Sequence, residues 1–281
     1  MAIPSALVRL AATLAVLAGL APAAWAADAA RRSIIGFSPD GAYFAFEEFG
    51  IQDGSAFPYA NVYIIDTARD EWVRGSPHRV LLQSDQARLD QARSEARNAA
   101  SDTLVRLAIG QQGEVIVSEA ADRLEKAARF VAFTVPDQGP VRGLGTVRLR
   151  ITEHQLQRAG CAFGKDLRGF VLQLEDAQGA PLRVMHEDRE IPPSRGCPKG
   201  YGISEVQIFP RIGKGPVLVV IVSVYRFGFE GLDRRYIGIA TAFDKNPQDP
   251  AASPAAEPPA PGPTPAARTQ KPKPPPGAPR P

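Results

Sequence analysis

Acidic side chains gather beside two Phe-Gly pairs that end predicted strands, Phe49-Gly50 and Phe227-Gly228. Carboxylate oxygens bind Ca²⁺ and accept hydrogen bonds from polar ligands. We hypothesise that the two corners lie side by side at one sheet edge and form a polar patch. Because Ca²⁺ needs about six to eight oxygens, we assign no metal, and an ordinary exposed acidic surface stays the alternative. The candidate binding patch consists of Glu47, Glu48, Asp53, Glu230 and Asp233.

The only two cysteines of the chain are Cys161 and Cys197. In an oxidising compartment, an even pair of cysteines is most simply a disulfide. Closing a loop of this length would stabilise the fold by about 4 kcal/mol in the chain-entropy model. We therefore predict a Cys161–Cys197 bridge, with two free thiols as the alternative.

The segment Ser194-Arg195-Gly196-Cys197 offers the one candidate nucleophile. It is similar to the serine-histidine-glycine-cysteine signature of the L,D-transpeptidases, which implies a catalytic thiolate and a neighbouring base. Here Arg195 stands in place of the signature's histidine, and His186 is closer than the family's upstream histidine. A bridge to Cys161 would also abolish the nucleophile. A cell-wall enzyme is therefore our alternative hypothesis, and we assign no catalytic residue.

The three histidines, His78, His154 and His186, lie far apart in the sequence. The chain contains no HExxH, CxxC or GxSxG motif, no P-loop, and no GxGxxG that opens a helix. We therefore expect no cofactor. The charged run from His186 to Glu190 predicts a solvated loop, because adjacent side chains of a strand or turn point in different directions.

The two ends of the chain differ in composition from its body. Residues 1–26 combine Arg9, an apolar run too short to span a bilayer and Ala24-Trp25-Ala26, a pattern typical of a cleavable signal peptide. Residues 246–281 are rich in proline and alanine and predict a disordered tail. The globular body is thus expected over residues 27–245, in a periplasmic or secreted protein with no membrane span after cleavage.

The body is predicted to be a β-rich α+β fold with antiparallel sheets. Residues 33–37, 42–46, 61–65 and 80–82, with Val73, predict a four-stranded N-terminal meander. Residues 84–109 have apolar and alanine positions at helical spacing, which predicts one long amphipathic helix packed on the sheet. A second helix is predicted around residues 119–128. Further strands are predicted at residues 130–135, 146–151, 168–174, 182–185, 204–208, 217–224 and 236–242.

Two resemblances span parts of the body. The segment from Phe37 to Asp66 resembles one blade of TolB-like propellers, although a complete propeller needs more strands than the chain offers. Together with residues 191–198 and 228–235, it also resembles a family of predicted secreted bacterial proteins, the domain of unknown function twenty-two fifty-nine. This second resemblance implies secretion, and the family has no assigned activity, ligand or catalytic residue to transfer.

A net charge of +3 without a concentrated basic segment excludes a nucleic-acid groove. Together with the missing catalytic motifs, this leaves a non-enzymatic role. We expect a protein that binds or scaffolds an unknown component of the cell envelope through loops at one sheet edge.

Overall fold

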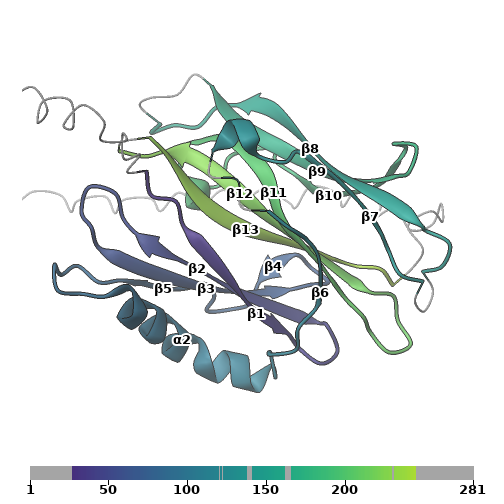
Figure 1. The fold of residues 1–281 in the computed structure, drawn as a ribbon, viewed down its shortest axis with the longest axis horizontal. Helices are drawn as coiled ribbons and strands as arrows, with labels where there is room; N and C mark the ends of the chain where they lie inside the picture. Colours follow the sequence, from purple (N-terminus) through teal and green to yellow (C-terminus); the bar gives the residue numbers. More distant parts are fainter. Residues whose placement is uncertain are drawn as a thin grey trace, which may run out of the picture.

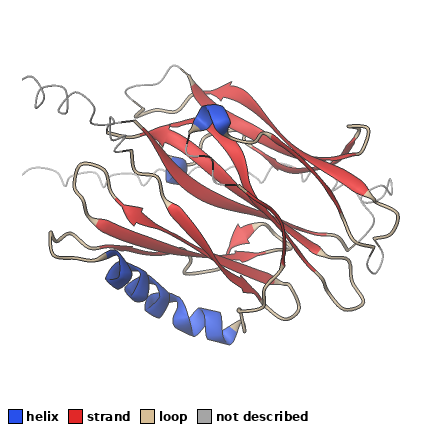
Figure 2. Cartoon of the chain, in the orientation of Figure 1, coloured by secondary structure: helices blue, strands red, loops and turns tan. Residues whose placement is uncertain are grey.

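The computed structural model describes residues 27–119, 121, 123–137, 141–161, 166–229 and 231–244. The predicted signal peptide and the predicted tail lie outside the described residues. Within this part of the chain, strands dominate and α2 (Leu89–Arg106) is the one long helix (Figure 2). Short 3₁₀ turns occur at η1 (Leu124–Lys126) and η2 (Pro193–Arg195). The predicted β-rich fold with antiparallel sheets is confirmed.

Three antiparallel sheets are stacked in layers (Figure 1). The helix-covered sheet contains β1 (Arg31–Phe37), β2 (Tyr43–Ile51), β3 (Pro58–Asp66), β4 (Glu71–Trp72) and β5 (His78–Leu81). The central sheet contains β6 (Glu114–Ser118), β11 (Pro198–Phe209), β12 (Val217–Phe227) and β13 (Leu232–Ala242). The outer sheet contains β7 (Phe130–Thr134), β8 (Thr146–Leu156), β9 (Leu167–Asp176) and β10 (Pro181–Glu187).

The central sheet is buried on both faces, which explains the uninterrupted apolar sequence of β12. Val220 and Val222 pack in the core shared with the outer sheet. Val219 and Ile221 pack in the core shared with the helix-covered sheet. A strand covered on both sides has no polar face, so its side chains need not alternate in character.

Helix α2 lies along the far side of the helix-covered sheet (Figure 1). Ala92, Ala96 and Ala100 are fully buried against that sheet, and small side chains let the helix approach it closely. The predicted helix and its packing on the sheet are confirmed. The buried face of the helix includes Ala100, whereas the neighbouring Ala99 is exposed. The helix is shorter than predicted, because the residues before Leu89 form turns.

The predicted N-terminal meander is present, and its fourth position is shared by β4 and β5, which both pair antiparallel with β3 at different registers. Two details of the predicted elements are wrong. The described residues of the second predicted helix contain only η1. Strand β6 was not predicted; it pairs with β11 at an edge of the central sheet. The likeness to a propeller blade is not confirmed by this arrangement.

Candidate functional site

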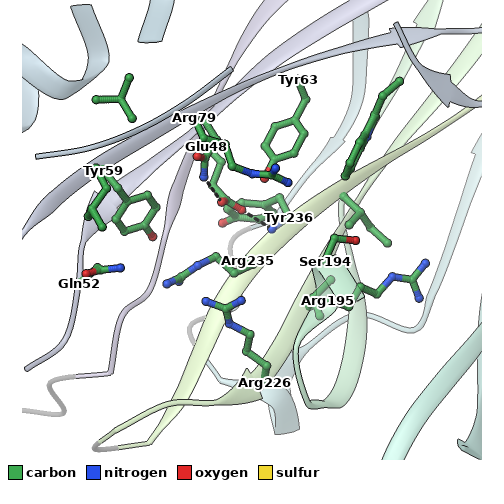
Figure 3. A pocket seen from close by; sticks show the side chains of 16 residues that line it. Glu48, Gln52, Tyr59, Tyr63, Arg79, Ser194, Arg195, Arg226, Arg235 and Tyr236 are labelled. Carbon is green, nitrogen blue, oxygen red and sulfur yellow. Dashed lines mark hydrogen bonds between the residues drawn. The ribbon is translucent and has the colours of Figure 1, made fainter. Parts of the chain in front are cut away.

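A cavity of about 310 Å³ lies along β13, the edge strand of the central sheet. One wall is the inner face of the helix-covered sheet, and the other walls come from β12, β13 and the η2 turn (Figure 3). Deeper in the same interface, Phe44, Phe46 and Ile65 form an apolar core. The cavity therefore marks the place where an apolar interface between two sheets gives way to polar side chains.

A cross-strand row of polar residues crosses the sheet wall. Glu48 on β2 is paired in register with Asn61 on β3, and Asn61 is paired with Arg79 on β5. Side chains opposite one another in an antiparallel pair share a face, and all three line the cavity. The regular alternation of these strands thus carries an acid, an amide and a base to one surface.

Glu48 is the buried acid of the cavity, with 1% of its surface exposed. Its Oε1 accepts a hydrogen bond from Asn61 Nδ2 at 3.0 Å, and its Oε2 accepts one from the backbone N–H of Tyr236 at 2.6 Å (Figure 3). No basic group of the described residues forms an ion pair with it within 4 Å. Burial raises the pKa of Glu48 above its ordinary value, against the opposing charge of Arg235.

Two guanidinium groups lie together beside Glu48. Figure 3 shows Arg226 next to Arg235. Arg226 Nε and Arg235 Nη2 are each 3.6 Å from Asp233 Oδ2, so one carboxylate holds both. Arg235 also donates to Asp28, which accepts a hydrogen bond from the hydroxyl of Tyr59 at 2.9 Å. Burial raises the pKa of Asp233, and the two arginine charges oppose that shift. Asp28 and Asp233 lie outside the cavity lining, so the lining presents the guanidinium groups.

The outer part of the sheet wall is aromatic. Trp72 is 43% exposed, and its ring centroid lies 5.9 Å from that of Tyr63. The guanidinium carbon of Arg79 lies 5.7 Å from the Trp72 centroid. Within the described part of the chain, the Arg79 guanidinium has this cation–π contact but no hydrogen bond or ion pair. Arg79 therefore keeps its N–H groups for solvent or a ligand.

The structure divides the predicted patch. Glu47 points to the other face of its sheet, where Arg93 and Arg97 of α2 donate to it at 2.6–3.1 Å. Glu48 lines the cavity, and Asp233 supports it from behind. Asp53 lies in the loop after β2, half-buried. Glu230 lies outside the described residues.

The loops that follow the two Phe-Gly corners lie against each other. A Cβ atom built on Gly54 would be 3.6 Å from the ring of Phe229, which is 82% exposed. The loops after β2 and β12 are thus neighbours, beside the end of the cavity that Gln52 and Arg226 line. The two loops are therefore adjacent, and of the predicted patch residues only Glu48 lines the cavity.

The charged run from His186 to Glu190 begins at the end of β10, and its residues Glu187, Arg189 and Glu190 are exposed. The prediction of a solvated run is wrong for Asp188, which is buried. It accepts hydrogen bonds from Arg195, from Phe170 N at 3.1 Å and, through Oδ1, contacts His186 Nε2 at 2.9 Å. Burial would raise the pKa of Asp188, but the His186 hydrogen bond and the Arg195 charge hold it below its ordinary value. This network fixes Arg195, so Ser194 and Arg195 form a wall of the cavity.

Cys161 and Cys197 form the predicted disulfide, with Cα atoms 5.8 Å apart. The bridge ties the segment after β8 to the residue that follows the η2 turn, and Arg158 Nη1 donates to Gly196 O at 2.6 Å beside it. Both cysteines of the chain are therefore oxidised, and Cys197 has no thiolate. This removes the nucleophile that the transpeptidase hypothesis needs.

Among the described residues, no group of three or more histidine, cysteine or acidic side chains is arranged to hold a metal ion. A search of the same residues finds no helix long and apolar enough to cross a membrane.

The basic and aromatic residues of the cavity were not predicted from the sequence. They lie on five strands and one turn, and the first and last of them are more than 150 residues apart along the chain. The available signal was the alternation of β2, β3 and β5, which places Glu48, Asn61 and Arg79 on one face. Using it requires the strand register, which the sequence does not show.

The fold and cavity define a disulfide-bonded protein of three layered antiparallel sheets, with a polar cavity at the edge of the central one. The chain belongs to the family of predicted secreted proteins designated DUF2259, which it matches over residues 45–241. No curated protein and no solved structure matches the chain.

Proposed function

We propose that this protein is a non-enzymatic binding protein of the bacterial envelope, periplasmic or secreted, that holds an anionic ligand in the cavity along β13. The observation that supports this most directly is the lining itself. Four arginines line the cavity together with a single carboxyl group, that of Glu48. Guanidinium groups pair readily with carboxylates and phosphates, often through two hydrogen bonds.

The four arginines are not equally available. Arg195 is committed to Asp188, and Arg235 to Asp28. Arg226 has one ion pair, at 3.6 Å, and Arg79 has none within the described residues. The anion is therefore expected between Arg79 and Arg226, which come from the two sides of the cavity.

Of the predicted patch, this proposal keeps Glu48 as a cavity group and Asp233 as the group that orients Arg226 and Arg235. It gives Glu47 a structural role only. Asp53 and Glu230 remain candidates for the rim, because they belong to the two adjacent loops. An envelope location is supported by the family description and by the disulfide, which persists in oxidising compartments.

Calorimetric titration of the mature protein with phosphate, citrate and benzoate at low ionic strength tests the proposal. At least one of these anions should bind, and Arg226→Gln should weaken that binding about tenfold or more. Arg106→Gln, an exposed arginine of α2, is the matched control and should leave it unchanged. Equal effects of the two substitutions would show that the anion binds nonspecifically, and the proposal would then be wrong.

The proposed location has its own test. Fractionation of the native host should recover the protein outside the cytoplasm, with a mass that corresponds to a chain beginning at Ala27. Recovery of the intact leader from the cytoplasm would contradict this part of the proposal.

A further inference from the structure

We infer that the ligand of this cavity is a sugar that carries an anionic group, either a carboxylate or a phosphate. The inference rests on the proposed function and narrows it, because it assigns chemistry to the parts of the cavity that do not bind the anion. Three features of the cavity carry it: the polar floor, the exposed indole ring and the guanidinium group of Arg79, which has no ion pair among the described residues.

The polar floor calls for neutral hydrogen-bond donors on the ligand. Each Glu48 oxygen accepts one hydrogen bond from the protein and keeps a lone pair for another partner. Beside it, Gln52 and Ser194 also line the cavity and can both donate and accept. Hydroxyl groups satisfy such a mixed surface, whereas an apolar ligand would leave its groups unpaired at a cost.

Positive charge argues against an ammonium group at the same place. An amino acid could in principle direct its ammonium to Glu48 and its carboxylate to the arginines. However, Arg235 already lies close enough to Glu48 to oppose the pKa shift of its carboxyl group. A further cation beside Arg235 and the guanidinium group of Arg79, which has no ion pair among the described residues, would be repelled. Hydroxyl groups carry no such penalty.

The exposed ring of Trp72 supplies an apolar platform at the outer end of the cavity. A pyranose ring has a face of C–H bonds that packs on an indole face, while its hydroxyl groups point sideways. Next to this platform, Arg79 has N–H groups free of other partners within the described residues. A sugar stacked on Trp72 therefore brings its acidic substituent within reach of a guanidinium group and its hydroxyls toward the polar floor.

Calorimetric titration of the full mature protein with D-galacturonic acid, its methyl ester and D-galactose isolates the charge, because the three share a ring. Glucose 6-phosphate separates a phosphate source from a carboxylate source. Benzoate, glutamate and inorganic phosphate represent a flat acid, a zwitterion and the bare anion. At least one of the two acidic sugars should bind about tenfold more tightly than galactose, the ester, benzoate, glutamate and phosphate.

Substitutions separate the parts of the cavity. For the acidic sugar that binds, Arg226→Gln should reduce affinity about tenfold or more, and Trp72→Leu about five- to tenfold. Trp72→Leu should leave the weak binding of inorganic phosphate unchanged, which a general loss of structure would not do. Arg106→Gln is again the control, and circular dichroism melts should show that every variant is folded.

Each other outcome overturns the inference. If benzoate, glutamate or phosphate binds as tightly as the acidic sugars, the site binds anions and the proposed function stands, but the ligand is not a sugar. If galactose or the ester binds as tightly as the acidic sugar that binds best, charge is not recognised. If neither acidic sugar binds, the inference is wrong, and if no anion of either experiment binds, the proposed function is wrong as well.

Discussion

Glu47 and Glu48 are neighbours in β2, both buried, and their surroundings are opposite. Glu47, with no exposed surface, faces α2 and accepts four hydrogen bonds from Arg93 and Arg97. Glu48 faces the cavity, where an amide and a backbone N–H are its hydrogen-bond donors among the described residues. One strand thus carries a neutralised carboxylate on one face and an acid with no ion pair on the other.

The difference shows on which side of the sheet the buried carboxylate is fully paired by the protein itself. On the helix side, the chain itself supplies the charges that a buried carboxylate needs. On the cavity side, burial raises the pKa of Glu48 and the polar groups retain bonding capacity. Buried acids with shifted pKa values in cavities are characteristic of functional sites. Substitutions on the helix side should therefore affect stability, and substitutions on the cavity side should affect binding.

The largest expected effect comes from the disulfide that ties down the η2 wall of the cavity. Replacing both cysteines, Cys161→Ser with Cys197→Ser, should lower the free energy of unfolding by about 3 to 4 kcal/mol, since it opens a loop of 36 residues. Urea denaturation measures the loss. Hydrogen exchange should increase more in residues 193–200 than in α2, because the bridge lies on the cavity side.

The comparison between the two sides would fail if exchange rose equally in α2 and in residues 193–200. The unsubstituted protein under a reductant serves as the matched sample. Its free energy of unfolding should fall by the same amount as that of the double variant. A smaller fall would show that the serine hydroxyls, and not the missing bridge, destabilise the variant.

The second prediction compares the two glutamates directly. Glu47→Gln should cost about 2 to 3 kcal/mol, because it removes charge-assisted hydrogen bonds to two arginines. Glu48→Gln should cost less than about 1 kcal/mol, since Asn61 can turn its amide to accept from the new side chain. Chemical denaturation at pH 7 measures both. A larger loss of stability for Glu48→Gln than for Glu47→Gln would reverse the assignment of roles.

The different surroundings of the two faces of the helix-covered sheet could be predicted from the sequence only in part. The alternation of residues 42–46 and the alanines of the helix indicated that a helix packs on the N-terminal sheet, and it does. The compartment and the pair of cysteines indicated the bridge. These features depend on local spacing or on a single pairing, which a sequence displays.

The cavity could not be predicted, because it depends on register and on contacts between sheets. Glu47 and Glu48 look alike in the sequence, and only the period of two separates them once the covered face is known. The burial of Asp188 was missed for a similar reason. Its partner Arg195 follows a proline-rich turn, and nothing in the run from His186 to Glu190 shows that this turn folds back onto it.

A third prediction concerns the join between the helix-covered and central sheets, on the side away from α2. Asp70, in the turn between β3 and β4, accepts a hydrogen bond from Ala240 N of β13 at 2.7 Å. Burial raises the pKa of Asp70 to about 7, against that hydrogen bond and with a small contribution from Glu71. A carboxyl with a raised pKa keeps its proton in the folded state over a range where the unfolded chain has lost it.

Stability should therefore decrease as the pH rises from about 4 to about 7, and the full cost is present above pH 7. Asp70→Asn should remove this dependence and raise the free energy of unfolding at pH 8.5 by about 2 kcal/mol, because Asp70 is partly shielded by solvent. At pH 4 the variant and the parent should be nearly equal. Denaturation curves at pH 4 and pH 8.5 test this prediction. An equal gain in the free energy of unfolding at both pH values would show that the carboxyl group of Asp70 does not titrate as described.

The smallest expected effect is at Phe229, on the loop beside Gly54. Because its ring is mostly exposed, Phe229→Ser should change the free energy of unfolding by less than about 0.5 kcal/mol. Phe46→Leu, in the buried core between the helix-covered and central sheets, is the control and should cost about 1 kcal/mol or more. Thermal and urea denaturation measure both.

The value of this variant lies in the ligand experiment. An exposed ring that contributes almost nothing to stability, on a loop adjacent to the cavity, resembles the apolar rim of a binding site more than a structural element. Phe229→Ser should therefore weaken the binding of the best anion two- to fivefold, a smaller loss than Arg226→Gln causes. Unchanged affinity would limit the site to the cavity itself, and the adjacency of the two Phe-Gly loops would then be a matter of folding alone.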